Sequence, residues 1–290
     1  MIELVGNTPL VEFKVLNQNP RVKLYGKLEG QNPGGSVKDR AALNMITKAV
    51  ERGDLDGGKK IIEATSGNTG IALAMIAAMK KIPITLLMPE SATEERKASM
   101  RAYGANLILT DGTKGIEYSR KLAAEMAQDE DYVLLNQFGN QDNPDAHYHS
   151  TGPEIWRDTE QKITHFVSSM GTTGTIMGTS RFLKEKNLNI KVIGVQPEEG
   201  SRIPGIRKWS PEMVPSICDF SRVDEIRLVS KETAVVSTRR LAAEEGIMAG
   251  MSSGGVTSAA VQVAQELDKG IVVCIICDRG DRYLSSGLFE

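Results

Sequence analysis

Residues 60–81 read KIIEATSGNTGIALAMIAAMKK. Residues 60–64 form a short apolar run, residues 65–70 are small and mostly polar, and residues 71–81 are helix-like in length and apolar content. This order predicts a strand, a loop and a helix, which is a βα unit. The apolar run 84–88 follows directly, so the helix is a crossover that predicts parallel pairing of the two strands.

The same pattern recurs along the chain. The expected strands are 106–109, 165–169, 191–195 and 271–277, and the expected helices are 93–103, 174–186 and 256–267. The pattern at residues 22–28 predicts a further strand, but the sequence does not show which sheet it joins. We therefore predict an α/β protein with two doubly wound domains and mostly parallel sheets. The polar, proline-containing stretch 141–144 predicts a hinge near the middle of the chain.

Length, composition and charge exclude several classes of protein. The chain has 290 residues, 40% of them hydrophobic and 25% charged, which is typical of a globular protein with room for two domains. Its formal net charge of -2 provides no broad positive field for nucleic acid or anionic lipid. No signal peptide or membrane-spanning stretch is recognisable. We expect a cytoplasmic protein that acts on small molecules and binds neither nucleic acid nor membranes.

The cysteines do not suggest a disulfide framework. There are three, Cys218, Cys274 and Cys277, and the last two lie in the predicted strand 271–277. Residues three apart on a strand face opposite sides, so two buried thiols are favoured over a metal or redox pair. Cys277, at the end of the strand, is also a candidate to line a pocket. Because no cluster of further ligands accompanies the three histidines, we expect no metal site.

Three small-residue segments precede expected helices. They are 65–70 (TSGNTG), 171–175 (GTTGT) and 252–255 (SSGG). Free backbone N–H groups at a helix N-terminus bind anions, although each segment alone is equally compatible with a simple helix cap. None has the P-loop lysine or the glycine spacing of a dinucleotide site, which disfavours ATP and NAD.

A fourth segment, 32–40 (NPGGSVKDR), places Lys38 where another helix is expected to begin. The positive end of the helix dipole disfavours the charged form of an amine, and an uncharged lysine is what Schiff-base chemistry requires. Taken alone, Lys38 is more simply a surface lysine. Together with the three anion-binding segments, it indicates a phosphorylated pyridine aldehyde that reacts with an amino acid.

These motifs make the chain recognisable, because it resembles the cysteine synthase family of fold-type II pyridoxal-phosphate (PLP) enzymes, whose architecture is tryptophan synthase β-like. The resemblance runs essentially from end to end. The segments that carry it are 6–10, 27–29, 36–40, 65–70, 151–156, 171–175, 197–198, 252–255 and 282–285.

The resemblance implies roles for individual residues of the site. Lys38 would carry PLP as a Schiff base and act as the catalytic base, Asn68 would contact the ring hydroxyl, and Ser252 would face the ring nitrogen. The cofactor phosphate would lie on Gly171, Thr172, Thr173, Gly174 and Thr175. The substrate carboxylate would lie on Thr65, Ser66, Thr69 and Gln137. The implied reaction is β-replacement, in which sulfide displaces acetate from O-acetyl-L-serine to give L-cysteine.

The resemblance also implies an organisation of the molecule. A smaller, mobile substrate-binding domain is expected over 35–145, with 1–12 as a candidate extension. A larger domain that binds the PLP phosphate is expected over 13–34 and 146–290. The family resemblance further implies a homodimer.

Two segments resemble the B type of cysteine synthase. They are 203–209 (IPGIRKW) and 277–282 (CDRGDR). This likeness implies a roomy pocket lined by Arg207, Lys208, Trp209 and Cys277, which would accept thiosulfate as well as sulfide and so make S-sulfocysteine. Lys208 departs from the arginine of the B-type motif and lacks its bidentate geometry. A solvated or interface loop is the alternative interpretation of 207–209.

Two other functions remain as alternatives. One is a different fold-type II enzyme, such as a cystathionine β-synthase or a serine/threonine dehydratase. The other is a non-catalytic α/β protein that binds amino acids or anions and regulates a partner. Lys38 discriminates between enzyme and binding protein, because a binding protein has no need of a Schiff-base amine.

Overall fold

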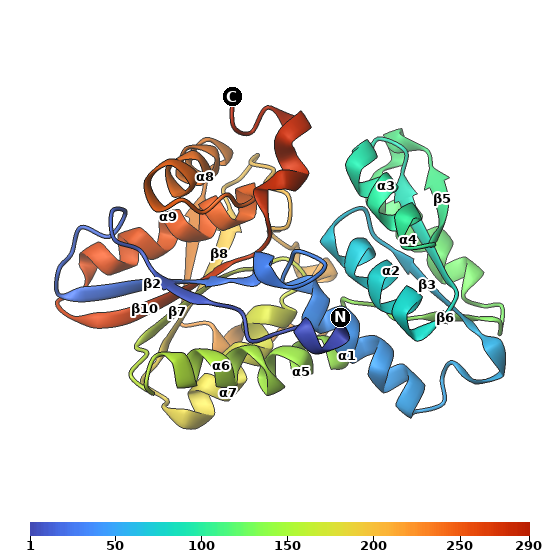
Figure 1. The fold of residues 1–290 in the computed structure, drawn as a ribbon, viewed down its shortest axis with the longest axis horizontal. Helices are drawn as coiled ribbons and strands as arrows, with labels where there is room; N and C mark the ends of the chain where they lie inside the picture. The colour runs from blue at the N-terminus through green and yellow to red at the C-terminus, as the bar shows by residue number, and fades with distance from the viewer.

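Two sheets with helices packed on both faces form the two lobes in Figure 1. A computed structural model describes residues 1–290. One lobe holds a four-stranded sheet in the order β5-β4-β3-β6, and the other holds a six-stranded sheet in the order β1-β2-β10-β7-β8-β9. The α/β class and the two sheets predicted from the sequence are confirmed.

The four-stranded sheet is entirely parallel, as the pattern at 60–88 predicts. Its elements, in chain order, are β3 (Lys60–Ala64), α2 (Asn68–Lys80), β4 (Ile84–Pro89), α3 (Glu94–Ala102), β5 (Asn106–Thr110), α4 (Gly115–Met126) and β6 (Tyr132–Leu134). Helix α1 (Lys38–Glu51) packs against α2 on one face, and α4 covers the other face.

Side chains alternate across this sheet. Ile61 and Leu86 belong to the core shared with α1 and α2, whereas Ile62 and Leu87 pack on the opposite face against Ala123 of α4. Because both faces are covered, β3 and β4 are buried along almost their whole length and do not alternate between buried and exposed residues. Every residue from 71 to 77 of α2 is buried, which explains why that helix lacks a polar stripe.

The six-stranded sheet is parallel except for β1 (Leu10–Glu12), which runs antiparallel to β2 (Val22–Leu28). Its other elements are α5 (Asp142–His149), α6 (Thr151–Asp158), β7 (His165–Ser169), α7 (Gly174–Lys186), β8 (Lys191–Pro197), β9 (Glu225–Val229), α8 (Lys231–Glu245), α9 (Met251–Glu266) and β10 (Gly270–Ile276). Helix α9 packs on one face, and α6 and α7 contribute to the core on the other. No helix in the protein combines the length and hydropathy needed to cross a bilayer.

Three sequence-based expectations are settled by this sheet. Strand β2 lies in it, between β1 and β10. Cys274 belongs to the core on one face and Cys277 to the core on the other, so their predicted opposite orientation is confirmed. All three cysteines are free thiols.

One expectation about a loop is wrong. Residues 252–255 are not a loop, because α9 already begins at Met251 and they form its first turns. The stretch 141–144, where the sequence predicts a hinge, lies at the start of α5, and Pro144 is tolerated there because first-turn N–H groups have no partner within the helix. Asp142 there is held by α1, since Arg52 forms an ion pair with its carboxylate at 2.8 Å and Asn44 donates to its carbonyl at 2.7 Å.

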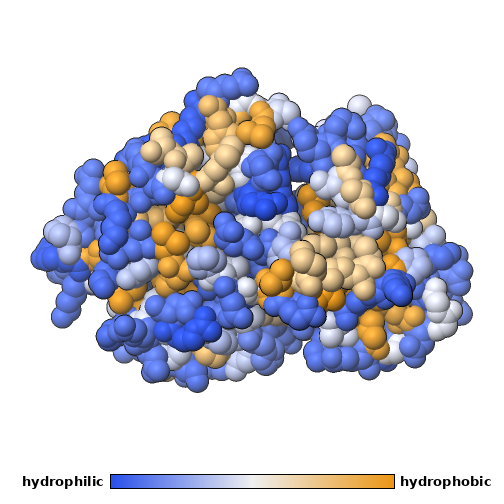
Figure 2. Space-filling model, in the orientation of Figure 1, coloured by the Kyte–Doolittle hydropathy of each residue, from blue (hydrophilic) through white to orange (hydrophobic).

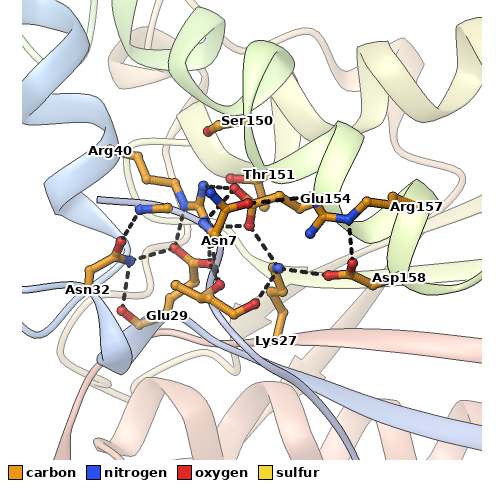
Figure 3. A network of polar contacts seen from close by, with 12 residues as sticks. Asn7, Lys27, Glu29, Asn32, Arg40, Ser150, Thr151, Glu154, Arg157 and Asp158 are labelled. Carbon is orange, nitrogen blue, oxygen red and sulfur yellow. Dashed lines mark hydrogen bonds and ion pairs between the residues drawn. The ribbon is translucent and has the colours of Figure 1, made fainter. Parts of the chain in front are cut away.

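A buried ion cluster joins the N-terminal segment, β2, α1 and α6 (Figure 3). Arg40 donates to Glu29 at 2.7 and 2.8 Å and to Glu154 at 2.6 and 2.8 Å. Lys27, which is fully buried, pairs with Glu154 at 2.8 Å and donates to the carbonyl of Thr8 at 2.7 Å. Burial opposes ionisation of Glu154, but hydrogen bonds and charge from Arg40 and Lys27 lower its pKa to about 2.

Replacing Arg40 tests how much this cluster contributes to the free energy of unfolding. Arg40→Met leaves Glu29 and Glu154 buried without their main cation, and we expect it to lower the free energy of unfolding by about 3–5 kcal/mol. Urea unfolding followed by circular dichroism measures this change. As a matched control, Arg157→Met removes a cation from the exposed pair with Asp158 and is expected to cost less than about 1 kcal/mol. Equal effects of the two variants would contradict the prediction.

Candidate active site

A cavity of about 1220 Å³ is lined by residues from both lobes. Most of the residues predicted for the site line it: Lys38, Thr65, Ser66, Asn68, Thr69, Gln137, Gly171, Thr172, Arg207, Lys208, Trp209, Ser252 and Cys277. Thr173 and Thr175 line an adjoining recess that also contains Lys38 and Gly171. Gly174 lines neither space and begins helix α7. Residues far apart in the sequence are thus brought to one place.

Lys38 is the first residue of α1 and opens on this cavity. The chain just before it is fixed, because the N–H of Val37 donates to the carbonyl of Cys277 at 2.8 Å. Burial disfavours the ammonium form and lowers the pKa of Lys38, while Cys277, Asp278 and Glu29 act in the opposite direction. The balance increases the fraction of neutral amine, which is the nucleophilic form.

The segment 171–175 wraps the N-terminus of α7, which is 13 residues long. Thr173 has a left-handed backbone (φ 71°), and its hydroxyl oxygen is buried without a hydrogen-bond partner. A Cβ at Gly171 would lie 2.4 Å from the carbonyl oxygen of Gly205, so only glycine fits there. An unsatisfied hydroxyl beside helix-terminal N–H groups is a suitable anion site.

His147 lies behind this segment and is buried. Its Nε2 is 3.3 Å from the hydroxyl of Thr175, and its Nδ1 is 2.8 Å from the hydroxyl of Thr151. Burial lowers the pKa of His147 to about 3, so the ring is neutral and supports the segment by hydrogen bonding.

Ser252 lies at the start of α9, and Cys277 directly follows β10. Ser252 is buried in the first turn of α9 and lines the cavity, and the next residue, Ser253, accepts a hydrogen bond from the N–H of Cys277 at 2.9 Å. Burial raises the pKa of the Cys277 thiol. The thiol is therefore protonated near neutral pH and offers a weak donor, not a thiolate nucleophile.

The segment 65–69 and Gln137 form a second group of donors. Thr65, Thr69 and Gln137 are buried, and the hydroxyl of Thr69 donates to Oε1 of Gln137 at 2.8 Å. This contact leaves the Nε2 of Gln137 without a protein acceptor. Together with the helix-terminal N–H groups at the start of α2, it provides donors for a carboxylate.

Asn68 is held by two residues of the C-terminal segment. Its Nδ2 donates to Asp278 at 2.7 Å, and its Oδ1 accepts from Arg282 at 2.5 Å. Asp278 also accepts from the hydroxyl of Tyr283 at 2.6 Å and from the N–H of Gly250 at 3.2 Å. One amide hydrogen of Asn68 has no protein acceptor. Sequence reasoning missed these partners, although the segment 277–282 that contains them had a recognisable motif.

Residues 207–209 occupy the rim of the cavity. The indole N–H of Trp209 donates to the carbonyl of Gly171 at 2.9 Å, and the guanidinium of Arg207 lies 5.1 Å from the Trp209 ring. Arg207 also pairs with Glu117 of α4 at 3.2 Å, which connects the two lobes. Lys208 is exposed. The side chains of Arg207 and Trp209 are therefore held in the site, whereas Lys208 has no partner there.

Comparisons with known proteins identify the class. The family model described as "Pyridoxal-phosphate dependent enzyme" matches residues 1–278. The chain is 56% identical to cysteine synthase B of Pseudomonas aeruginosa (99% of this chain, 96% of that protein) and 54% identical to cysteine synthase B of Escherichia coli (99% and 95%). The crystal structure of cysteine synthase from Entamoeba histolytica superposes with a TM-score of 0.94 at 38% identity, covering 99% of this chain and 89% of that one.

The chain therefore belongs to the pyridoxal-phosphate dependent enzymes. Within that class its relatives are cysteine synthases, and the resemblance stated from the sequence is confirmed. The residues present fit the cofactor: Lys38 supplies an amine, the buried hydroxyl of Thr173 lacks a partner, and Ser252 is a neutral group on the same cavity. A neutral partner for the ring nitrogen moderates the electron-withdrawing power of the cofactor.

A buried acid next to Lys38 yields a pH-dependent prediction. Asp39 accepts from the N–H of Gly34 at 2.5 Å, and its Oδ1 is buried without a partner. Burial raises the pKa of Asp39 to about 7, against the hydrogen bond from Gly34 and the charge of Arg282. The folded protein therefore holds the proton of Asp39 more tightly than the unfolded chain does. The stability that this proton contributes is fully present below the unfolded pKa of Asp39 and is lost as the pH rises through about 7.

We expect Asp39→Asn, which cannot ionise, to gain stability over the wild type by about 1–3 kcal/mol at pH 8, and to gain less at pH 5. The amide oxygen still accepts from Gly34, so this hydrogen bond is retained. Urea unfolding at the two pH values measures the difference. A gain that is the same at both pH values would show that ionisation of Asp39 is not its cause.

Proposed function

We propose that this enzyme replaces the acetate of O-acetyl-L-serine with sulfide to form L-cysteine. The observation that carries the proposal is that Lys38 lines the same cavity and adjoining recess as two groups of anion-binding donors, 171–175 and 65–69 with Gln137. One group suits a cofactor phosphate, and the other suits an amino-acid carboxylate. The high identity to cysteine synthases supports this function over that of a dehydratase or a cystathionine β-synthase.

Each group of residues has a separate task. Thr65, Ser66, Thr69 and Gln137 bind the substrate carboxylate and so fix the orientation of the Cα–H bond. Asn68 would contact the ring hydroxyl of the cofactor through its remaining amide hydrogen, and Ser252 would face the ring nitrogen. When bound, PLP supplies the electron sink that acidifies the α-proton. The neutral amine of Lys38 takes this proton, acetate leaves from Cβ, and Lys38 returns the proton to Cα after the sulfur nucleophile has added at Cβ.

Closure of the site is a further part of the proposal. Residues 35–145 form the smaller substrate-binding domain, and 13–34 with 146–290 form the larger one. Binding of the carboxylate at 65–69 draws the smaller domain inward and excludes water from the reacting centre. The structure places β1 in the larger sheet, whereas Ile2 and Val5 pack against the core of the smaller one, so the segment 1–12 bridges both.

We also propose that the enzyme is a homodimer in the cytoplasm. The face drawn in Figure 2 is mainly hydrophilic, with an apolar area beside the N-terminus. Met1, Leu4 and Met79 are exposed apolar side chains, with exposed fractions of 60%, 60% and 40%. Apolar surface of this kind supports a subunit contact.

The role of Lys38 is tested with a single variant. We expect Lys38→Ala to form cysteine from O-acetyl-L-serine and sulfide at least about 10³-fold more slowly than the wild type, because the residue is both anchor and base. The rate of L-cysteine formation by the PLP-loaded protein measures this. Lys48→Ala, on the exposed side of α1, is the control and should retain full activity. Turnover that survives in Lys38→Ala would overturn the proposed function.

Thiosulfate is the second sulfur donor that we propose, with Arg207 as its cationic contact and S-sulfocysteine as the product. We expect Arg207→Ala to raise the KM for thiosulfate about tenfold and that for sulfide less than about twofold, because only the larger dianion gains a charge-assisted hydrogen bond. Lys208→Ala is the matched control, since its side chain is exposed. Equal changes for both donors, or no product from thiosulfate, would remove Arg207 from this role.

A further inference from the structure

Glu63 is a buried acid that none of the steps above uses. It lies in β3, two residues before Thr65, and is 3% exposed. Its Oε2 accepts the N–H of Asn136 at 2.8 Å, and the backbone N–H of the next residue, Gln137, also acts to lower the pKa of its carboxyl group. Glu63 forms no salt bridge. The charge that acts on it belongs to Arg120 of α4, which is itself paired with Glu117 at 2.7 Å.

The turn that donates the N–H of Asn136 to Glu63 is unusual. Asn136 has a left-handed backbone (φ 53°), and its carbonyl accepts from the N–H of Gly139 at 3.0 Å. The carbonyl of Gln137 accepts from Asn143 at 2.7 Å. The backbone of Gln137 is therefore fixed on one side through the preceding residue, Asn136, whose N–H donates to Glu63, and on its carbonyl side by Asn143. With both sides fixed, the side chain reaches Thr69 at 2.8 Å.

Stability alone does not account for a carboxylate at this position. Burial raises the pKa of Glu63 to about 7, although the N–H groups of Asn136 and Gln137 act in the opposite direction. A buried acid without a paired cation costs folding free energy. An ionised acceptor, however, holds backbone N–H groups more strongly than a neutral one.

We propose that Glu63 is a positioning residue that sets Gln137 for binding of the substrate carboxylate. This inference rests on the proposed role of Gln137. Glu63 does not touch the substrate, and it acts by holding the turn 136–137 against the end of β3. Strand β3 thus has two tasks. It leads into the segment 65–69, and through Glu63 it orients the side-chain amide of Gln137, which contacts Thr69 of that segment.

The test compares amino-acid binding with turnover in the PLP-loaded enzyme. L-Serine is titrated against the visible absorption of the cofactor to give a dissociation constant, and steady-state kinetics give kcat and both KM values. For Glu63→Gln we expect the dissociation constant of L-serine and the KM for O-acetyl-L-serine to rise about five- to tenfold, which corresponds to one weakened hydrogen-bonded contact. The kcat, the KM for sulfide and the resting spectrum should stay within about twofold of the wild type.

Two further variants locate the effect. Glu63→Met, which has no acceptor, should bind L-serine more weakly than Glu63→Gln, so that glutamine acts as a partial rescue. Gln137→Ala should weaken L-serine binding by itself, and adding Glu63→Gln to it should change nothing more, because the two residues act in series. Glu125→Gln, an exposed acid on α4, is the control and should match the wild type.

The outcomes separate this inference from the proposed function. If Glu63→Met does not fold, the comparison of Glu63→Gln with the double variant still shows whether Glu63 acts through Gln137. A Glu63→Gln enzyme that binds L-serine as the wild type does, or additive effects in the double variant, would overturn the positioning role and leave cysteine formation intact. A Gln137→Ala enzyme with wild-type affinity would overturn both this role and the proposed carboxylate site.

Discussion

Burial of one guanidinium between two carboxylates is the constraint on which the site depends. Arg40 lies two residues after Lys38 and is fixed between Glu29 and Glu154, so the first turn of α1 is tied to the turn after β2 and to α6 (Figure 3). A buried charge with this many partners has few alternative arrangements. The cluster therefore fixes where α1 begins and directs Lys38 toward the cavity, although none of its members lines the cavity.

The parallel sheets explain why the other functional groups meet Lys38. The segments that follow β3, β7 and β10 all start at the carboxyl ends of their strands, where α/β proteins form binding crevices. Two of these segments lead into helices whose N-terminal N–H groups attract anions, at α2 and α7. The third carries Asp278, which connects Asn68 with the start of α9. Donors suited to a cofactor phosphate and to a substrate carboxylate thus line the same cavity as one amine.

Sequence patterns predicted the strands and helices whose periodicity is unambiguous, including the whole unit 60–88, and the residues of the anion segments. They did not predict α4, β6, α8 or β9, and they placed a loop at 252–255, where α9 has already begun. Sequence patterns did not predict contacts between residues that are far apart in the chain. Nothing local in the sequence indicates that Asp278 and Arg282 would hold Asn68, or that Glu63 would hold the turn before Gln137. Such partners follow from the packing of separate segments.

The proposed attachment of the cofactor to the amine of Lys38 can be tested chemically. Borohydride reduces a Schiff base to a stable secondary amine, so treatment of the PLP-loaded enzyme followed by proteolysis and mass spectrometry identifies the attached residue. We expect one modified peptide, with the pyridoxyl-phosphate group on Lys38 and the visible band lost in proportion. A group attached to another lysine, or no modified peptide from a protein that had bound PLP, would contradict it.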